Sequence, residues 1–168
     1  FCAVSHCWEL QNKPDMTGAQ LRAVTHFLCE HPAIEFVWID WCCMPQKSTA
    51  GVDDRTAEEK ADFKRMLDSV NLLYLASTVL VLCDVSYPSR FWCLFECWLA
   101  LQLATPRGLE SVLLHEDDAE LLCSTRRTYG RAHFVLMHLA KAYTLQQLIG
   151  LLGREQPEEI FRILSSPD

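Results

Sequence analysis

An unbroken apolar run from Thr78 to Asp84 constrains the fold of this chain more than any other segment. The run reads Thr-Val-Leu-Val-Leu-Cys-Asp and has the length of a typical β-strand. A strand with one face in water alternates apolar and polar residues, whereas this run is apolar on both faces. It therefore predicts a strand buried on both sides, as in a parallel sheet that helices cover on each face.

Further strand-like runs occur before and after this segment. Residues 1–5 and 34–40 have β-type composition and end in polar residues, which predicts two more strands. We expect a fourth strand over 109–115, while residues 134–143 fit a strand, a helix or both. Strands that alternate with helices are typical of an α/β domain with a mostly parallel sheet.

Helical patterns separate the strand-like runs. Apolar residues at three- and four-residue spacing predict a helix that begins near Thr17 and another that begins at Asp54 or Thr56. A third helix follows Ser89, whose hydroxyl group can cap it. Two more helical patterns lie at residues 145–152 and 157–164.

The length and charge of the chain limit its class. The 168 residues fit one domain with a sizeable core, so we treat 1–168 as a single domain. Because the chain begins at Phe1 inside a strand-like run, we expect it to be excised from a larger multidomain protein. The formal net charge of -7 argues against a nucleic-acid partner, whose phosphates need clustered Lys and Arg.

The sequence predicts a cytoplasmic domain. No apolar run reaches the roughly eighteen residues of a membrane-spanning helix, and no signal peptide is visible. The nine Cys residues lie mostly in apolar runs, their number is odd, and no C-x-x-C motif occurs. This pattern favours buried, reduced thiols over disulfides or a zinc site, so we expect no metal.

Glu96 is the most unusual residue of the third predicted helix. From Phe91 to Ala104 only Glu96 and Gln102 have side chains that hydrogen-bond strongly, so most faces of this helix must be buried. A buried carboxylate without a partner is highly unfavourable. We expect Glu96 either to have a partner inside the protein or to border a cleft, as catalytic carboxylates do.

The predicted topology places several polar residues near Glu96. In a sheet of this type ligands bind beyond the carboxyl ends of the strands where the strand order reverses, between the first and third strands. Ser5 and His6 end the first strand, and Asp84 and Ser86 follow the third. Glu96 lies close to the same edge, which predicts one shared cleft.

Four segments resemble known domains. Residues 86–96, Ser-Tyr-Pro-Ser-Arg-Phe-Trp-Cys-Leu-Phe-Glu, resemble the S/Y-x-x-S-x-W-C-x-x-E segment of Toll/interleukin receptor (TIR) domains. Residues 4–8, 37–46 and 66–76 are similar to the S-Y-x-W-G, W-I-D-x-x-C-I-N-Q and M-x-x-I-Y-x-x-A motifs of the heterokaryon-incompatibility (HET) domain. The resemblance implies a TIR-like, flavodoxin-like three-layer fold with a central, mostly parallel sheet of four to five strands.

The resemblance also implies a reaction. In the NAD-cleaving TIR domains the Glu that matches Glu96 is catalytic, so we expect cleavage of the nicotinamide–ribose bond, with NAD as the substrate and no cofactor. Such domains are cytoplasmic immune or cell-death signalling modules that associate with one another. Six residues are candidates for binding the substrate: Ser5, His6, Trp8, Asp40, Trp41 and Ser86.

Other roles stay open for these residues. His6 can form local hydrogen bonds instead of contacting substrate, and Asp40 can cap the loop after its strand. Trp8 and Trp41 each follow a strand end and could stack on a substrate ring, whereas we expect Trp92 to belong to the core. A non-catalytic adaptor and a nucleotide-sensing module are the alternative functions.

Overall fold

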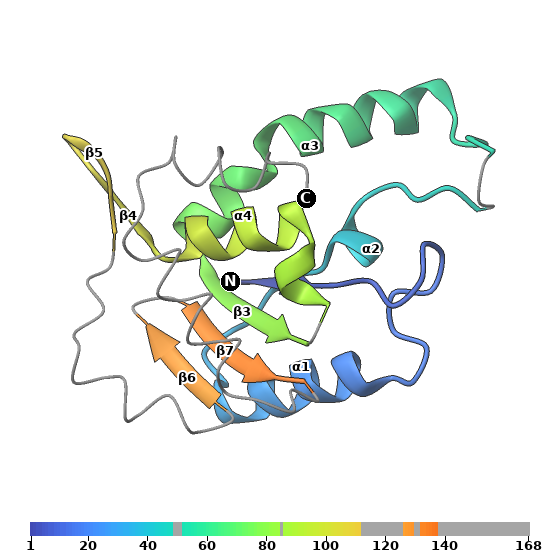
Figure 1. Cartoon of the computed structure of the whole chain (residues 1–168). Helices are drawn as coiled ribbons and strands as arrows, with labels where there is room; N and C mark the ends of the chain where they lie inside the picture. Colours follow the sequence, from blue (N-terminus) through green and yellow to red (C-terminus); the bar gives the residue numbers. More distant parts are fainter. Residues whose placement is uncertain (49–51, 85, 112–125, 130–131, 138–168) are drawn as a thin grey trace.

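A five-stranded sheet forms the centre of the structure, a computed structural model that describes residues 1–48, 52–84, 86–111, 126–129 and 132–137 (Figure 1). The strand order is β2-β1-β3-β7-β6, and only β6 runs antiparallel to its neighbour. The mostly parallel α/β architecture is therefore as predicted. The strands are β1 (Cys2–His6), β2 (Val37–Trp38), β3 (Thr78–Cys83), β6 (Arg126–Tyr129) and β7 (Ala132–Leu136).

The apolar run of β3 lies in the middle of this sheet. Parallel neighbours β1 and β7 flank it, and its residues from Val79 to Cys83 are buried. Helices cover both faces of the sheet. Helix α1 (Ala19–Glu30) lies on one face, and α3 (Ala57–Ala76) and α4 (Phe91–Ala100) lie on the other (Figure 1).

Two separate cores result from this layering. On the α1 side Val24 and Phe27 pack against Val4 and Leu80 of the sheet. On the other side the apolar residues of α4 pack against alternate residues of β1, β3 and β7, such as Ala3. The side chains of a strand alternate between the two faces, so the wholly apolar β3 contributes to both cores.

The helix boundaries confirm one predicted cap and correct another. Thr56 caps α3, since its hydroxyl accepts from the Glu59 amide and the Glu59 carboxylate accepts from the Thr56 amide. Ser89 does not cap α4 as predicted. It ends a short 3₁₀ helix, η1 (Tyr87–Ser89), whose Tyr87 amide donates to Asp84 Oδ1, and α4 begins only after this turn.

The strand predicted at 109–115 is confirmed for its described part, residues 109–111, but it does not join the central sheet. Residues 109–111 belong to β5 (Gly108–Ser111), which forms an antiparallel hairpin with β4 (Gln102–Thr105) outside the central sheet. Gly108 has a φ of 120°, a backbone conformation that glycine adopts most readily, and this permits the tight turn. The fourth parallel strand is β7 (Ala132–Leu136) instead, which overlaps the beginning of the segment 134–143 that fits either a strand or a helix.

Some expectations are shortened or lie outside the described residues. The strand predicted at 34–40 is reduced to Val37–Trp38, and the short helix α2 (Asp40–Cys43) follows it. The helices predicted at 145–152 and 157–164 lie outside the described ranges. Among the described helices, none has the length and apolarity needed to cross a bilayer.

Candidate functional site

The strand order reverses between β1 and β3, as the sequence predicted. β1 lies between β2 and β3, so the connections from β1 and from β3 leave toward opposite sides of the sheet. Ser5 and His6 stand at the carboxyl end of β1, beside Val81 and Leu82 of β3. This edge is where ligands bind in open α/β sheets.

Glu96 projects from α4 toward this edge and contacts β1. Its Oε2 atom accepts a hydrogen bond of 2.6 Å from the Ser5 hydroxyl. Burial raises the pKa of Glu96 to about 7, while hydrogen bonds from Ser5 and Tyr74 oppose that shift. The side chain still lines a pocket, so it meets both predicted conditions: a partner inside the protein and a cleft beside it.

Ser5 links Glu96 to a buried tyrosine. Its hydroxyl lies 2.5 Å from Tyr87 Oη, and the Tyr87 hydroxyl donates to the Cys93 carbonyl at 2.8 Å. These contacts connect the Glu96 carboxyl group through Ser5 and Tyr87 to the backbone of α4.

His6 is held from both sides by oxygen atoms. Its Nδ1 lies 2.6 Å from Oε1 of Gln20, and its Nε2 lies 3.1 Å from Oδ1 of Asp40. Gln20 presents its oxygen because its Nε2 donates to the Cys7 carbonyl. Burial alone would lower the pKa of His6, but the hydrogen bond and charge of Asp40, with Gln20 and Glu96, raise it. The arrangement favours an imidazolium that donates from both nitrogens.

Asp40 organises the other edge of the site. Besides His6, it accepts from Trp8 Nε1 at 2.9 Å and from the Trp41 amide at 2.6 Å. Its position at the start of α2 makes the second interaction possible. Asp40 therefore holds the segment that follows β2 and also lines the pocket.

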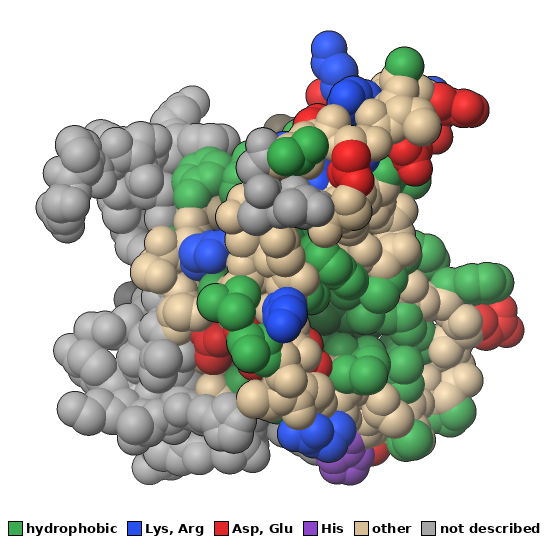
Figure 2. Space-filling view, turned by 90° about the vertical axis from the view of Figure 1, so that its right-hand side faces the viewer, with side chains coloured by type: hydrophobic (Ala, Val, Ile, Leu, Met, Phe, Trp, Pro, Cys, Tyr) green, Lys and Arg blue, Asp and Glu red, His purple; other side chains and the backbone are tan. Residues whose placement is uncertain are grey.

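A pocket of about 280 Å³ opens beside Glu96. Figure 2 views this end of the molecule and shows hydrophobic side chains gathered around a hollow. The pocket combines flat apolar surface with groups that can bind a polar ligand. Its aromatic walls include Trp8, Trp38, Phe63 and Trp92, and its ionisable groups are His6, Asp40, Arg90 and Glu96.

The predicted substrate-binding residues lie at four different places. His6, Trp8 and Asp40 line the Glu96 pocket, whereas Ser5 has 0% exposure and lies behind Glu96. Ser86 lines neither of the two pockets described, and its hydroxyl donates to Asp84 Oδ1 at 2.7 Å. Trp41 lines a second pocket instead, on the α1 side of β1, and makes an edge contact with Trp8.

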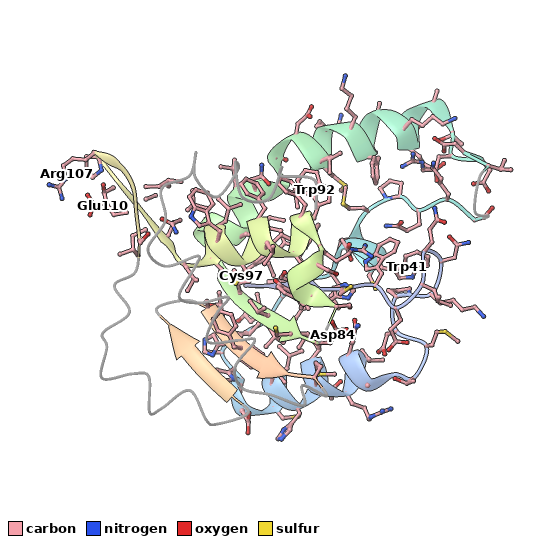
Figure 3. The ribbon with its side chains drawn as sticks, in the orientation of Figure 1. Trp41, Asp84, Trp92, Cys97, Arg107 and Glu110 are labelled. Atoms are coloured by element: carbon pink, nitrogen blue, oxygen red, sulfur yellow. The ribbon has the colours of Figure 1, made fainter. Side chains whose placement is uncertain are left out.

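The expectation that Trp92 belongs to the core is wrong. Its side chain is 57% exposed and lines the Glu96 pocket at the start of α4 (Figure 3). The buried face of α4 is formed by later residues such as Cys97 and Trp98. The apolar composition of this helix predicts burial on most of its faces. Trp92 in its first turn instead lies at the rim of the pocket, where it contacts Phe91 and Phe95.

Several residues of the site carried no usable sequence signal. Tyr87 was only the residue before a proline, and Gln20 was one polar residue among several in the first helix. Both act through contacts with residues far away in the chain. Tyr74, a buried residue of α3, also acts on Glu96, which lies on another helix.

No protein-family model, curated protein or solved structure matches this chain. Within the described ranges, no cluster of three or more His, Cys, Asp or Glu residues has a geometry that could hold a metal ion.

Proposed function

We propose that this chain is a TIR-like NAD⁺ nucleosidase in which Glu96 is the catalytic residue. The observation that carries the proposal is the position of Glu96, which is partly buried and lines a pocket at the switch point of a parallel sheet. The strand order β2-β1-β3-β7, with helices on both faces, is consistent with a flavodoxin-like fold.

The proposed chemistry suits the partly buried carboxylate of Glu96. Cleavage of the bond between nicotinamide and ribose leaves positive charge on the ribose as it becomes an oxocarbenium ion. Nicotinamide departs as a neutral molecule with the bonding electrons, so no strong general acid is required. Ionised Glu96, hydrogen-bonded to the ribose hydroxyls or beneath C1, stabilises this charge most where water is excluded.

The second reactant decides the product. Attack of water on C1 gives ADP-ribose and releases a proton, while attack by a nitrogen of the adenine ring gives a cyclic product. Both outcomes use the same first step and the same carboxylate. The proposal therefore covers hydrolysis and cyclisation together.

The other pocket residues supply binding groups of the right kinds. Trp8 and Trp92 offer ring faces or edges for a planar base. Arg90 is exposed at the pocket and can pair with the diphosphate through its guanidinium group. The His6 imidazolium, whose two N–H groups are held by Gln20 and Asp40, adds a second positive charge beside the pocket. These contacts would orient the substrate relative to Glu96.

The biological setting follows from the same resemblance. We infer an immune or cell-death signalling domain that works in the cytoplasm within a larger protein and associates with other TIR-like domains. Association matters for the assay, because neighbouring domains often complete a TIR active site. Activity is therefore to be measured at high protein concentration or on a crowding surface.

The test compares NAD⁺ consumption by the wild type and by Glu96→Gln, with products separated by chromatography. We expect nicotinamide release from the wild type and none from the variant, which keeps the shape of the side chain. Glu58→Gln changes an exposed residue in the first turn of α3 and serves as the matched control with full activity. Far-UV circular dichroism and sedimentation would show that all three proteins fold and assemble alike.

Other outcomes would replace the proposal. Saturable NAD⁺ binding without any product would favour a nucleotide-sensing module. Self-association with neither binding nor turnover would favour a non-catalytic adaptor. Equal turnover by wild type and Glu96→Gln would remove Glu96 from the mechanism.

A further inference from the structure

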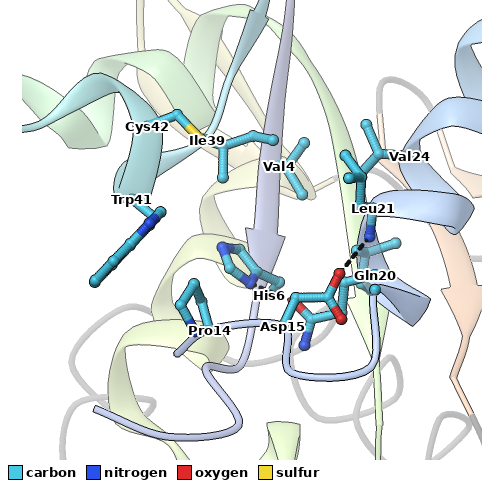
Figure 4. Close-up of a pocket in the computed structure, with 12 residues that line it drawn as sticks. Val4, His6, Pro14, Asp15, Gln20, Leu21, Val24, Ile39, Trp41 and Cys42 are labelled. Atoms are coloured by element: carbon cyan, nitrogen blue, oxygen red, sulfur yellow. Dashed lines mark hydrogen bonds between the residues drawn. The ribbon is translucent and has the colours of Figure 1, made fainter. Parts of the chain in front are cut away.

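A second pocket lies on the α1 side of β1, separate from the Glu96 pocket (Figure 4). It has a volume of about 310 Å³, slightly more than the first. Its apolar walls come from the sheet, from α1 and from the segment after β2, and include Val4, Val24, Ile39 and Leu82. Trp41 adds an aromatic side chain to this pocket.

Asp15 contributes the polar feature of this pocket. Its Oδ2 atom accepts a hydrogen bond of 2.8 Å from the Leu21 amide, drawn as a dashed line in Figure 4. Its Oδ1 atom is buried and has no hydrogen-bond partner among the described residues. A buried carboxylate oxygen without a donor is unfavourable, because the atom has lost its hydration and has gained no hydrogen bond in return. A ligand that brings an N–H group to Oδ1 would remove this penalty.

We propose that this second pocket binds a small planar heteroaromatic amine, whose amino group donates to Asp15 Oδ1. The apolar walls suit a flat ring more than a sugar or a phosphate, which would bury hydroxyl or charged oxygens against Val24 and Ile39. The negative charge of Asp15 also excludes anionic ligands. Ring shape and one donor are thus the two features that the pocket selects.

The occupant would communicate with the Glu96 pocket through His6. His6 lines both pockets, and Gln20, which lines only the second, holds His6 Nδ1 at 2.6 Å. A ring that displaces the Gln20 amide would change the hydrogen bonds of the imidazole, and Asp40 on its other side would respond. This connection is separate from the proposed NAD⁺ cleavage, which uses the first pocket.

A matched pair of probes tests the proposal. 9-Methyladenine carries an exocyclic amino group, whereas 9-methylpurine has the same ring system without any N–H donor. Titration of the whole 168-residue chain, followed by the NMR signals of the Trp41 indole and the His6 ring, should give saturable shifts with the first probe. The second probe lacks this charge-assisted hydrogen bond, so we expect it to bind at least about tenfold more weakly.

Two variants locate the site. Asp15→Asn can keep the Leu21 contact through its amide oxygen while presenting an NH₂ group in place of Oδ1, and should weaken 9-methyladenine binding about tenfold. Val24→Phe should fill the pocket and abolish binding, with thermal unfolding measured to show that each variant is folded. Glu96→Gln should bind this probe as the wild type does.

Some results would overturn the proposal. Equal affinity for the two probes, or unchanged affinity in Asp15→Asn, would show that the Asp15 carboxylate is not the recognition group. Binding that disappears in Glu96→Gln would place the probe in the first pocket. Absence of any shift at Trp41 and His6 at millimolar probe would show that the second pocket does not take such a ring. None of these results depends on whether NAD⁺ is cleaved.

Discussion

The Ser5 hydroxyl donates to Glu96 Oε2 over 2.6 Å, although 91 residues separate the two in the sequence. The contact joins the end of β1 to the middle of α4. Because Ser5 is completely buried, it acts on a ligand only through Glu96. We therefore interpret Ser5 as a positioning residue for the carboxylate, not as a residue that binds substrate directly.

Replacement of Ser5 by Ala should loosen this link. The hydrogen bond from Ser5 lowers the pKa of Glu96, so its loss should raise that pKa further. We expect a loss of about 1–3 kcal/mol in the free energy of unfolding, because buried polar groups lose a partner. Ser69→Ala, an exposed change on α3, should cost less than about 0.5 kcal/mol. Urea unfolding and NMR titration of Glu96 measure both effects, and an unchanged pKa would contradict this role.

The raised pKa of Glu96 predicts a specific pH dependence of stability. The folded protein holds the Glu96 proton up to about pH 7, whereas the unfolded chain releases it near 4.5. Stability should therefore fall as pH rises from 4.5 to 7, by at most about 3 kcal/mol from this group. Glu96→Gln has no such proton, so the free energy of unfolding of the variant should rise relative to that of the wild type over this range.

Urea unfolding at several pH values checks this prediction. Glu58→Gln serves as the control and should follow the wild-type curve. Parallel curves for wild type and Glu96→Gln would show that Glu96 titrates normally. If ionised Glu96 is the reactive form, NAD⁺ cleavage should increase with pH through the same region near 7.

The partnership of His6 and Asp40 predicts a second loss of stability with rising pH, in the same direction as that of Glu96. The pKa of His6 is raised, so this ion pair stabilises the folded state below the unfolded pKa of 6.5. That stabilisation is lost as pH rises through the higher folded pKa. In Asp40→Asn burial should dominate, and the pKa of His6 should drop below 6.5. NMR titration of the ring measures it, and Asp53→Asn, which removes the exposed partner of Arg55, should leave it unchanged.

Much of the central fold could be predicted because the strand signals are local. The apolar run of β3 and the capping box at Thr56 each identify an element from a few adjacent residues. The sheet to which residues 109–111 belong could not be predicted in the same way. A hairpin strand and a sheet strand have similar composition, and the choice depends on pairing between distant segments, here β3 with β7.

Some residues of the candidate site could likewise be predicted from the sequence, and others could not. Glu96 could be identified because one carboxylate in an apolar helix is unusual, and Ser5 and His6 because topology places strand ends together. Tyr87 could not be identified, since its role arises from contacts with the distant Ser5 and with the Cys93 carbonyl. Asp15 was also missed, because an unsatisfied oxygen is recognised only when its surroundings are known.

The cysteines should differ sharply in reactivity. Cys29 and Cys42 are exposed free thiols, whereas Cys83 and Cys93 are buried, and burial raises the pKa of Cys83 to about 12. A thiol reacts as the thiolate, so the exposed pair should be alkylated rapidly by iodoacetamide and the buried pair only after unfolding. Peptide mass mapping over time measures this order, and early modification of Cys93 would contradict the packing of α4.

Two tryptophans of α4 provide a matched test of where the core ends and the pocket begins. Trp98 is 4% exposed and Trp92 is 57% exposed, so the same substitution should have very different costs. Trp98→Ala should lower the free energy of unfolding by about 3–5 kcal/mol, as for other large core residues. Trp92→Ala should lower it by less than about 1 kcal/mol but should weaken the binding of any ligand in the Glu96 pocket. Urea unfolding measures the effect on stability, and NAD⁺ titration measures the effect on binding. Equal losses of stability in the two variants would show that Trp92 belongs to the core.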